Sequence, residues 1–281
     1  MLIKNSEIIK LSSDIRKIID GQTIDLRDNR ANIFSILKND IHTLANQKNA
    51  QVHVLKQERD SMTDTLANIS HQLKTPLTSM MIMADLLDNA PPHKQREFIS
   101  NIKTELTRME WLVSALLKIA KLDAGTIEFS KDIIQSADLV ALAARPLQIL
   151  FEVKEQTLEI SCDTELVCDK RWTAEALTNV IKNASEYSPV GSKIYIESGM
   201  SPICKWISVR DSGAGIPNAK IPSLFRRFAG SRSDKGYGIG LPLALAIMRG
   251  QNGDIEVDGG GNGNGATFSL KLVAPHYSSS T

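Results

Sequence analysis

The chain has 281 residues, of which 42% are hydrophobic, and a net charge of +1 at pH 7. This length allows two domains, or one domain with an extended helical region, and this apolar content excludes wholesale disorder. The near-zero charge, with basic residues dispersed among acidic ones, gives no indication of nucleic-acid binding. No window approaches the roughly 18 uncharged apolar residues of a membrane span, and the first residues lack the apolar core of a signal peptide. We therefore expect the chain as given to be soluble.

The three cysteines are Cys162, Cys168 and Cys204. Their number is odd, and they show neither a CxxC motif nor a histidine at metal-ligand spacing. This usage predicts reduced cysteines of a cytosolic protein.

Residues 1–127 are poor in glycine and rich in helix formers. Apolar residues at helical spacing predict a first helix that ends at Asp20-Gly21, and a second apolar stripe begins at Phe34, after the polar connector 22–30. The apolar residues then approach a seven-residue repeat, on two lines formed by Leu55, Met62 and Ile69 and by Leu66 and Leu73. Such a repeat predicts a seam that packs against another helix, usually from a second chain.

The sequence Ala90-Pro91-Pro92 predicts a break, and a second amphipathic helix follows and ends near Gly125. Two antiparallel helices with one apolar face each bury that face most simply as a four-helix bundle. The helical region is therefore predicted to be an all-α hairpin that forms a homodimer.

Residues 128–275 hold most of the glycines and alternate between strand-like and helix-like runs. The predicted strands are 126–133, 157–161, 166–168, 193–198, 205–210, 254–258 and 266–272, and the predicted helices are 138–153, 170–187 and 239–249. This order, without a strict βαβ repeat, predicts an α+β sandwich with helices on one face of a mixed sheet. The glycine run 259–265 is predicted to be a hairpin connection.

His71 lies within the long helical pattern, one residue from a line of seam leucines. That position predicts an imidazole at the solvent edge of the bundle, where it is largely neutral at pH 7 and has a free lone pair for attack on phosphorus. A lone helical histidine is usually unremarkable. Pro76 favours a functional role for His71 over an ordinary structural one, because a proline inside a helix costs about 3 kcal/mol and bends the helix.

Glu175, Asn179 and Asn183 are four residues apart, so they share one face of the predicted helix 170–187. Carboxamide oxygens suit Mg²⁺ that is held jointly with nucleotide phosphates. The alternative for these residues alone is an ordinary polar helix face.

Two glycine-rich motifs follow. Asp211, Gly213 and Gly215 come directly after an apolar strand, where a backbone without side chains can pass close to a flat ligand. The second motif opens a helix and exposes amide groups suited to phosphate oxygens; it comprises Gly236, Gly238, Gly240 and Leu241. It matches neither a dinucleotide fingerprint nor a Walker P-loop. Residues 230–235 before it are predicted to form a mobile lid.

In this order the motifs resemble those of the sensor histidine kinases of bacterial two-component systems, over roughly residues 48–275. The matching positions are His71 with Thr75-Pro76 (His box), Asn179 and Asn183 (asparagine box), Asp211, Gly213 and Gly215 (first glycine box), Phe225 and Phe228 (phenylalanine box), and Gly236, Gly238 and Gly240 (second glycine box).

The resemblance implies four segments. Residues 1–47 are similar to a HAMP-type signalling module, 48–127 to a dimerisation and histidine phosphotransfer domain, and 128–275 to a catalytic domain of the Bergerat ATP-binding type. Residues 276–281 are expected to be a disordered tail. In this family such a chain is the cytoplasmic part of a membrane sensor, attached to the membrane only through further N-terminal segments.

The resemblance also implies roles for the site residues. Asp211 accepts a hydrogen bond from the adenine amino group, Tyr187 lines the base, and Asn183, helped by Asn179, holds Mg²⁺ against the phosphates of ATP. The second glycine box, with Leu241, completes the nucleotide site. The phosphoryl group passes from ATP to His71 and then to an aspartate of a response regulator receiver domain.

Two residues depart from the family pattern. Gln72 stands where an acidic residue usually follows the histidine; it can orient an imidazole but cannot take up a proton, so slower autophosphorylation is expected. Glu186 stands where a basic residue is common, and Lys182, Arg226 or Arg227 are candidates to replace it. Thr75 matches the position that orients water for dephosphorylation of the partner, so phosphatase activity is expected as well.

Three interpretations therefore stay open at this point. The first is an active kinase that is also a phosphatase. The second is a phosphatase-dominant sensor, in which replacing Gln72 with Glu raises autophosphorylation sharply. The third is a dimeric nucleotide-binding scaffold that transfers nothing.

Overall fold

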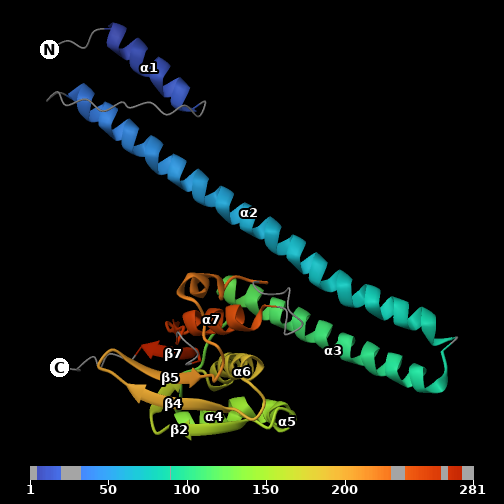
Figure 1. Cartoon of the computed structure of the whole chain (residues 1–281). Coiled ribbons are helices and arrows are strands. Elements are labelled where there is room, and N and C mark those ends of the chain that lie inside the picture. The colour runs from blue at the N-terminus through green and yellow to red at the C-terminus, as the bar shows by residue number, and fades with distance from the viewer. Residues whose placement is uncertain (1–4, 20–32, 89, 229–237, 261–264, 274–281) are drawn as a thin grey trace. The chain divides into compact units, whose positions relative to one another are not determined.

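The computed structural model describes the chain except for residues 1–4, 20–32, 89, 229–237, 261–264 and 274–281 (Figure 1). It divides into two compact units, 1–69 and 70–281, which are treated separately. Within the described part of the chain, no helix combines the length and the apolar character needed to cross a membrane.

The helical region consists of α1 (Asn5–Ile19), α2 (Ile33–Leu87) and α3 (Pro92–Asp123). The predicted break at Ala90-Pro91-Pro92 is confirmed, because α2 ends at Leu87 and α3 begins at Pro92. Helix α2 continues through Pro76, so this proline does not end it. The predicted connector 22–30 and the predicted tail 276–281 lie outside the described residues.

Helix α3 ends in a glycine cap, as predicted. Gly125 has a φ of 62°, and the N–H groups of Gly125 and Thr126 donate to the carbonyls of Leu122 (3.0 Å) and Lys121 (3.2 Å). This is the Schellman arrangement, which satisfies the last carbonyls of a helix. It sets the direction in which the chain enters the sandwich.

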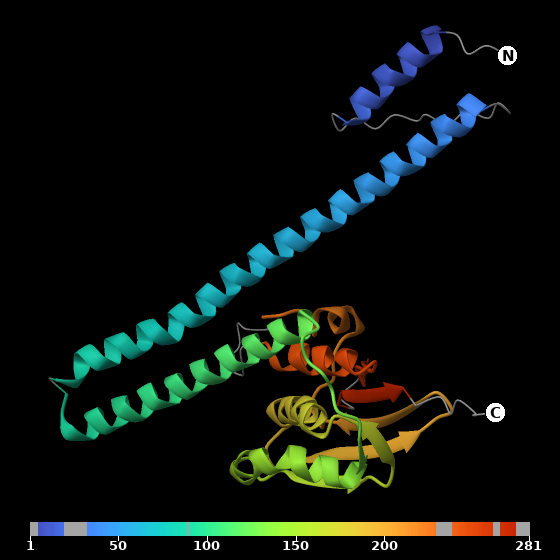
Figure 2. The ribbon, with the colours of Figure 1, turned by 180° about the vertical axis from the view of Figure 1, so that it is seen from behind.

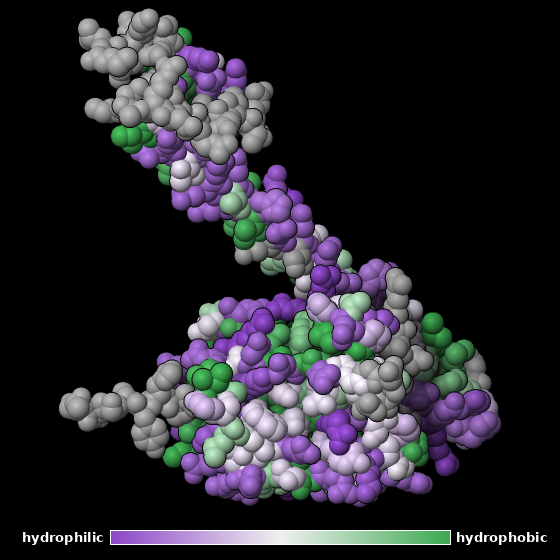
Figure 3. All heavy atoms as spheres, turned by 60° about the vertical axis from the view of Figure 1, so that its left-hand side comes forward, coloured by the Kyte–Doolittle hydropathy of each residue, from purple (hydrophilic) through white to green (hydrophobic). Residues whose placement is uncertain are grey.

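The predicted seam of α2 is apolar and exposed in the single chain. Leu55, Met62 and Leu66 are 62%, 64% and 55% exposed. Figure 3 shows hydrophobic residues on the surface of α2 among hydrophilic ones. A run of exposed large apolar side chains along one helix marks a surface that a partner covers.

The sandwich is built on a five-stranded sheet with the order β2-β4-β5-β7-β6. Strand β2 runs parallel to β4, and the other neighbours are antiparallel, so the sheet is mixed, as predicted. The bounds are β2 (Thr157–Ser161), β4 (Lys193–Met200), β5 (Cys204–Arg210), β7 (Thr267–Val273) and β6 (Asp254–Asp258). The predicted hairpin is confirmed by the antiparallel pairing of β6 with β7, although 261–264 lie outside the described residues. A separate two-stranded sheet pairs β1 (Asp132–Gln135) with β3 (Glu165–Cys168).

One layer of helices covers the sheet (Figures 1 and 2). Helix α6 (Lys170–Tyr187) packs between α4 (Ser136–Ala144) and α7 (Gly240–Gly250). The core lies between the two layers, where alternate strand residues meet the apolar stripe of α6; its fully buried side chains include Leu177, Ile181, Ile194, Ile196 and Phe268. The α+β sandwich is therefore confirmed.

Two sequence expectations need correction. The strand expected at 126–133 is shorter and later, at Asp132–Gln135, because Ser130 donates its N–H to the Asp169 side chain (3.0 Å) rather than to a neighbouring strand. The helix expected at 138–153 is broken into α4, a 3₁₀ turn at Arg145–Leu147 and α5 (Gln148–Val153). Pro146 lies within that turn, and it lacks the N–H that a continuous α-helix requires.

The three cysteines are free, as predicted. Burial raises the pKa of the Cys162 and Cys168 thiols. Both thiols are therefore protonated at neutral pH, which is the unreactive form.

Candidate functional site

His71 is exposed on α2, as its position beside the seam predicts. The Thr75 hydroxyl, one helical turn after His71, donates a hydrogen bond to the backbone carbonyl of His71 (3.2 Å). Gln72 is half-buried beside them. An exposed imidazole is accessible to a bulky phosphoryl donor, and no hydrogen bond or ion pair between described residues occupies its ring.

Helix α6 presents the two asparagines of the predicted site. Asp169 caps its first turn: Oδ1 accepts from the N–H groups of Arg171 and Trp172, and Oδ2 accepts from Ser130. Burial raises the pKa of the Asp169 carboxyl, but the hydrogen bonds from Trp172, Ser130 and Arg171 outweigh this effect and the net pKa is lowered. The cap therefore stays charged at neutral pH and stabilises the start of the helix.

Asn179 and Asn183 are half-buried, one turn apart on the face of α6 opposite the sheet. The Asn179 amide Nδ2 donates to the Glu175 carbonyl (2.9 Å), which leaves Oδ1 to act as an acceptor or ligand. Oδ1 faces the start of α7, and a Cβ on Gly240 would lie 3.1 Å from it. The structure thus brings the asparagine box and the end of the second glycine box together.

Asp211 lies in a buried loop after β5 and is 4% exposed. Its Oδ1 accepts hydrogen bonds from the N–H groups of Gly213 (2.8 Å) and Ala266 (3.1 Å). Both bonds use the same oxygen, so Oδ2 is the one that can accept a hydrogen bond from a ligand. The loop holds a carboxylate in a fixed orientation, as recognition of a base amino group requires.

Close backbone approaches explain two of the glycines around Asp211. A Cβ on Gly213 would lie 2.7 Å from the Tyr187 carbonyl oxygen, and a Cβ on Gly265 would lie 1.9 Å from the Asp211 carbonyl oxygen. Gly265 also has a φ of 70°, a conformation that other residues rarely adopt. Asp211, Gly213 and the end of α6 at Tyr187 are therefore in direct proximity, whereas Gly215 (φ 80°) turns the chain beyond them.

Two residues that sequence reasoning missed hold the end of α6. Gln156 is buried, and its amide donates to the carbonyls of Ser185 (3.2 Å), Ser188 (3.2 Å) and Pro189 (3.0 Å). The Lys154 ammonium donates to the Ser185 carbonyl (2.5 Å). Together they satisfy carbonyls at the helix C-terminus and fix the exposed Tyr187 beside the Asp211 loop. Nothing in their local sequence signals this role, because the contacts span about thirty residues.

The second glycine box is described only in part. The Gly238 carbonyl accepts a hydrogen bond from the N–H of Phe228 (2.9 Å), which links this box to the buried end of the phenylalanine box. Gly240 begins α7, and Leu241 is half-buried in its first turn. Gly236 and the predicted lid 230–235 lie outside the described residues.

Two of the three candidate replacements for the basic residue at position 186 have anionic partners. Lys182 lies 3.8 Å from Glu186, and Arg227 forms an ion pair with Asp123 of α3. Arg226 is exposed. The Lys182 ammonium is therefore close to the asparagines on α6, but the Glu186 carboxylate partly neutralises its charge.

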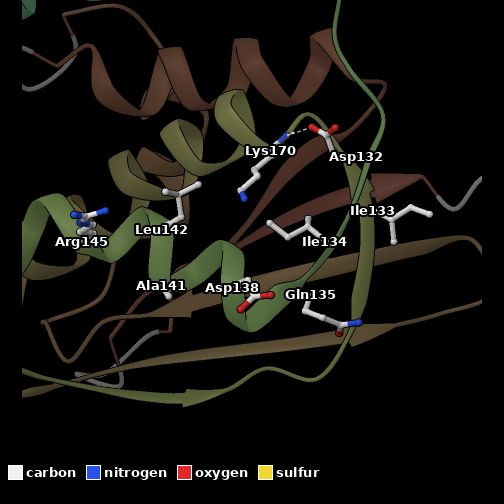
Figure 4. Close-up of a pocket in the computed structure, with 9 residues that line it drawn as sticks. All are labelled: Asp132, Ile133, Ile134, Gln135, Asp138, Ala141, Leu142, Arg145 and Lys170. Carbon is white, nitrogen blue, oxygen red and sulfur yellow. Dashed lines mark hydrogen bonds between the residues drawn. The ribbon is translucent and has the colours of Figure 1, made fainter.

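A cavity of about 630 Å³ lies away from this site (Figure 4). It lies against β1 and α4, and it contains Asp132, Asp138, Arg145 and Lys170 but none of the asparagine or glycine-box residues. A second cavity of about 560 Å³ is lined by Glu175, Asn179 and Lys182. This second cavity reaches the site at Asn179, whereas the Asp211 loop and the glycine boxes are not part of its lining.

Two family models match the chain, and together they cover more than half of it. The His Kinase A (phospho-acceptor) domain matches residues 61–125, and the histidine kinase-, DNA gyrase B- and HSP90-like ATPase matches residues 168–276. A helical hairpin matched by the first model, followed by a sandwich matched by the second, defines the class of the protein. The chain belongs to the sensor histidine kinases of two-component signalling systems.

Individual relatives agree with this assignment. Sensor histidine kinase WalK of Bacillus subtilis (strain 168) is 32% identical over 58% of this chain and 28% of its own length. Sensor histidine kinase YkoH of the same organism is 31% identical over 64% of this chain and 40% of its own length. The chain thus spans less than half the length of these curated relatives.

Among solved structures, histidine kinase ThkA in complex with the response regulator protein TrrA is similar in fold. Its TM-score is 0.63 at 19% sequence identity, and the match covers 80% of this chain and 66% of that one. At this identity the likeness shows the fold alone.

Proposed function

We propose that this chain transfers the γ-phosphoryl group of Mg-ATP to His71 and then to an aspartate of a response regulator. The observation that carries the proposal is that α6 meets both glycine-rich motifs, Gly240 at Asn179 and the Asp211 loop at Tyr187. An exposed histidine on α2, within the region matched by the phosphoacceptor model, supplies the nucleophile.

The sandwich residues would bind and orient ATP. Asp211 Oδ2 would accept a hydrogen bond from the adenine amino group, with Tyr187 beside the base. The carboxamide oxygens of Asn179 and Asn183 fit Mg²⁺, which supplies neutralisation of phosphate charge when it is bound. Gly238 and Gly240 leave the start of α7 open for phosphate oxygens, and Leu241 follows them in the first turn.

The transfer itself needs little from the protein beyond positioning. The free ring nitrogen of neutral His71 attacks the γ-phosphorus, the bond to the β–γ bridging oxygen breaks, and ADP leaves. The phosphorylated imidazolium then loses its remaining N–H proton to solvent. Gln72 can accept a hydrogen bond from the ring but cannot take up that proton, so a slow reaction is expected.

The steps that involve a second protein chain depend on the helical region. The exposed seam of α2 supports a homodimer in which the hairpins of two chains form a four-helix bundle. A response regulator would dock on this bundle, and ThkA, which has a similar fold, is bound to one in its solved structure. Thr75 would orient water to dephosphorylate the regulator, after its hydroxyl leaves the His71 carbonyl.

Three further points stay predictions. They are membrane attachment through further N-terminal segments, the domain boundaries 47/48 and 127/128, and the HAMP-like nature of residues 1–47.

The test is incubation with γ-labelled ATP and Mg²⁺ for the intact chain, His71→Ala and His93→Ala. We expect acid-labile, alkali-stable label that is lost in His71→Ala and kept in His93→Ala. Label that survives His71→Ala would contradict the assignment of the nucleophile. Absence of label while ATP still binds would favour a phosphatase-dominant sensor or a scaffold.

A further inference from the structure

Helix α6 carries an ion pair on the same face as its asparagines. Lys182 lies three residues after Asn179, and Glu186 lies three residues after Asn183. Residues three and four apart are neighbours on a helix surface, so the four side chains project from one side of α6. The Lys182 ammonium and the Glu186 carboxylate are 3.8 Å apart. We call these two residues the α6 ion pair.

The α6 ion pair is weak and can be opened. A separation of 3.8 Å is too long for a hydrogen bond, and the two side chains are 45% and 24% exposed. The lysine precedes the glutamate, which is the less favourable order for a pair four residues apart on a helix. The Lys182 ammonium also faces the Trp111 ring, 5.3 Å from its centroid, but it donates no hydrogen bond to any residue that the structure describes.

Two other cations of the sandwich and the adjoining helix α3 are already engaged by carboxylates. Lys118 donates to Glu175, with 2.5 Å between Nζ and Oε1, and Arg227 is paired with Asp123. Lys182 differs from both, because its N–H donors remain for a ligand.

Positions along α6 place Lys182 at the phosphate end of the proposed nucleotide site. The Asp211 loop meets α6 at Tyr187, and Gly240 meets it at Asn179. These two positions are eight residues apart, which is about 12 Å along the helix axis. A nucleotide whose base lies at Asp211 therefore extends its phosphates towards Asn179. Lys182 and Asn179 both line the cavity of about 560 Å³ at that end.

We propose, on the basis of the proposed nucleotide site, that Lys182 binds the terminal phosphate of ATP and sets the preference of the site for a triphosphate over a diphosphate. With ADP, the ammonium stays paired with Glu186. With ATP, it leaves Glu186 and donates hydrogen bonds to the γ-phosphate oxygens, because a terminal phosphate carries more negative charge than one partly exposed carboxylate. The third phosphate thus gains a contact that shorter nucleotides lack.

Titration calorimetry of the intact chain with Mg²⁺ tests this role without any phosphoryl transfer. The ligands are a non-hydrolysable ATP analogue and ADP, and the readout is the ratio of their dissociation constants. In Lys182→Gln we expect the analogue to bind at least about tenfold more weakly, which is the loss expected for one hydrogen bond to a charged group. ADP should change by less than about twofold, because its phosphates do not reach Lys182.

Three further variants separate a phosphate contact from a structural role of the α6 ion pair. Glu186→Gln removes the same ion pair but keeps the ammonium, so it should keep the preference for the analogue. Lys182→Arg keeps the charge and should also keep this preference. Lys271→Gln is the matched control, because it removes a lysine that is paired with Glu256 outside α6, and it should change the binding of neither ligand.

The outcomes separate the role of Lys182 from the proposed function. A ratio that stays unchanged in Lys182→Gln, or that falls as far in Glu186→Gln, overturns the role of Lys182 and leaves the kinase assignment standing. A parent chain that binds neither nucleotide overturns the proposed function and the role of Lys182 with it. Selective loss of the analogue in Lys182→Gln, without label on His71 in the parent chain, supports the role of Lys182 and overturns the kinase assignment.

Discussion

The helical region and the sandwich differ in where their large apolar side chains lie. On α2, Leu55, Met62 and Leu66 are more than half exposed in the single chain, whereas Ile194 and Phe268 of the sandwich are completely buried. Both regions are rich in apolar residues, but only the sandwich buries them within one chain. The sandwich thus has its own core, whereas the seam of the helical region is left uncovered in the single chain, as the proposed homodimer requires.

The largest effect is expected where the sandwich core is opened. Phe268→Ala should lower the free energy of unfolding of the sandwich by about 3–5 kcal/mol, because it removes a fully buried ring and leaves a cavity. Thermal unfolding followed by near-ultraviolet circular dichroism measures this. Ser269→Ala, on the opposite face of the same strand, is the control and should change little. Equal effects of the two variants would mean that the core does not lie between sheet and helices.

A slightly smaller effect is expected where the Asp211 loop meets β7. Gly265→Ala should destabilise the sandwich by about 2–4 kcal/mol and weaken nucleotide binding, because it adds a Cβ that overlaps the Asp211 carbonyl oxygen at a positive φ. Gly125→Ala shares the positive φ, but its Cβ meets nothing within 4 Å, so it should cost only about 1–2 kcal/mol. Calorimetry and titration with an ATP analogue distinguish the two. Unchanged nucleotide affinity in Gly265→Ala would argue against the Asp211 site.

A third variant changes the apolar seam of α2 in the helical region. Leu66→Asp should weaken self-association by about 2–3 kcal/mol, because a charge replaces an apolar side chain that the second copy covers. Sedimentation equilibrium measures the dissociation constant, and binding of ATP analogue should be unaffected. Gln57→Asp, which lies off both lines of the seam on the same helix, is the control. A monomeric parent chain, or equal effects of both variants, would refute the dimer seam.

The smallest effect is expected at the cap of α6. Asp169→Ala should destabilise the sandwich by about 1–2 kcal/mol at pH 7, because the first-turn N–H groups lose their acceptor. The lowered pKa of Asp169 means that its stabilisation is present above the unfolded pKa of about 3.9 and is lost as the pH falls through the lower folded value. The difference between parent and variant should therefore shrink below about pH 4. Asp163→Asn, which changes an exposed carboxylate, is the control and should leave the stability at pH 7 nearly unchanged.

The element boundaries were predictable wherever the local signal is strong. The helix 170–187 and the strands 157–161 and 254–258 were predicted with their observed bounds, because capping, periodicity and turn residues all agree there. The prediction of a strand at 126–133 was wrong, because the Ser130 N–H bonds to the side chain of Asp169, which is distant in sequence. The site residues were found as motifs, and their functional roles stay predictions.

The sequence by itself determined the periodicity of α2, the capping of α6 and the order of the glycine-rich motifs, because these depend on residues within one or two turns of each other. Only the tertiary structure decided that Gln156 and Lys154 hold the end of α6 and that both fixing bonds of Asp211 fall on one oxygen. It also decided that Lys118 and Trp111 of α3 contact Glu175 and Lys182 of α6. These contacts join segments far apart along the chain, and packing of the sheet and helices brings them together. No local spacing encodes that proximity.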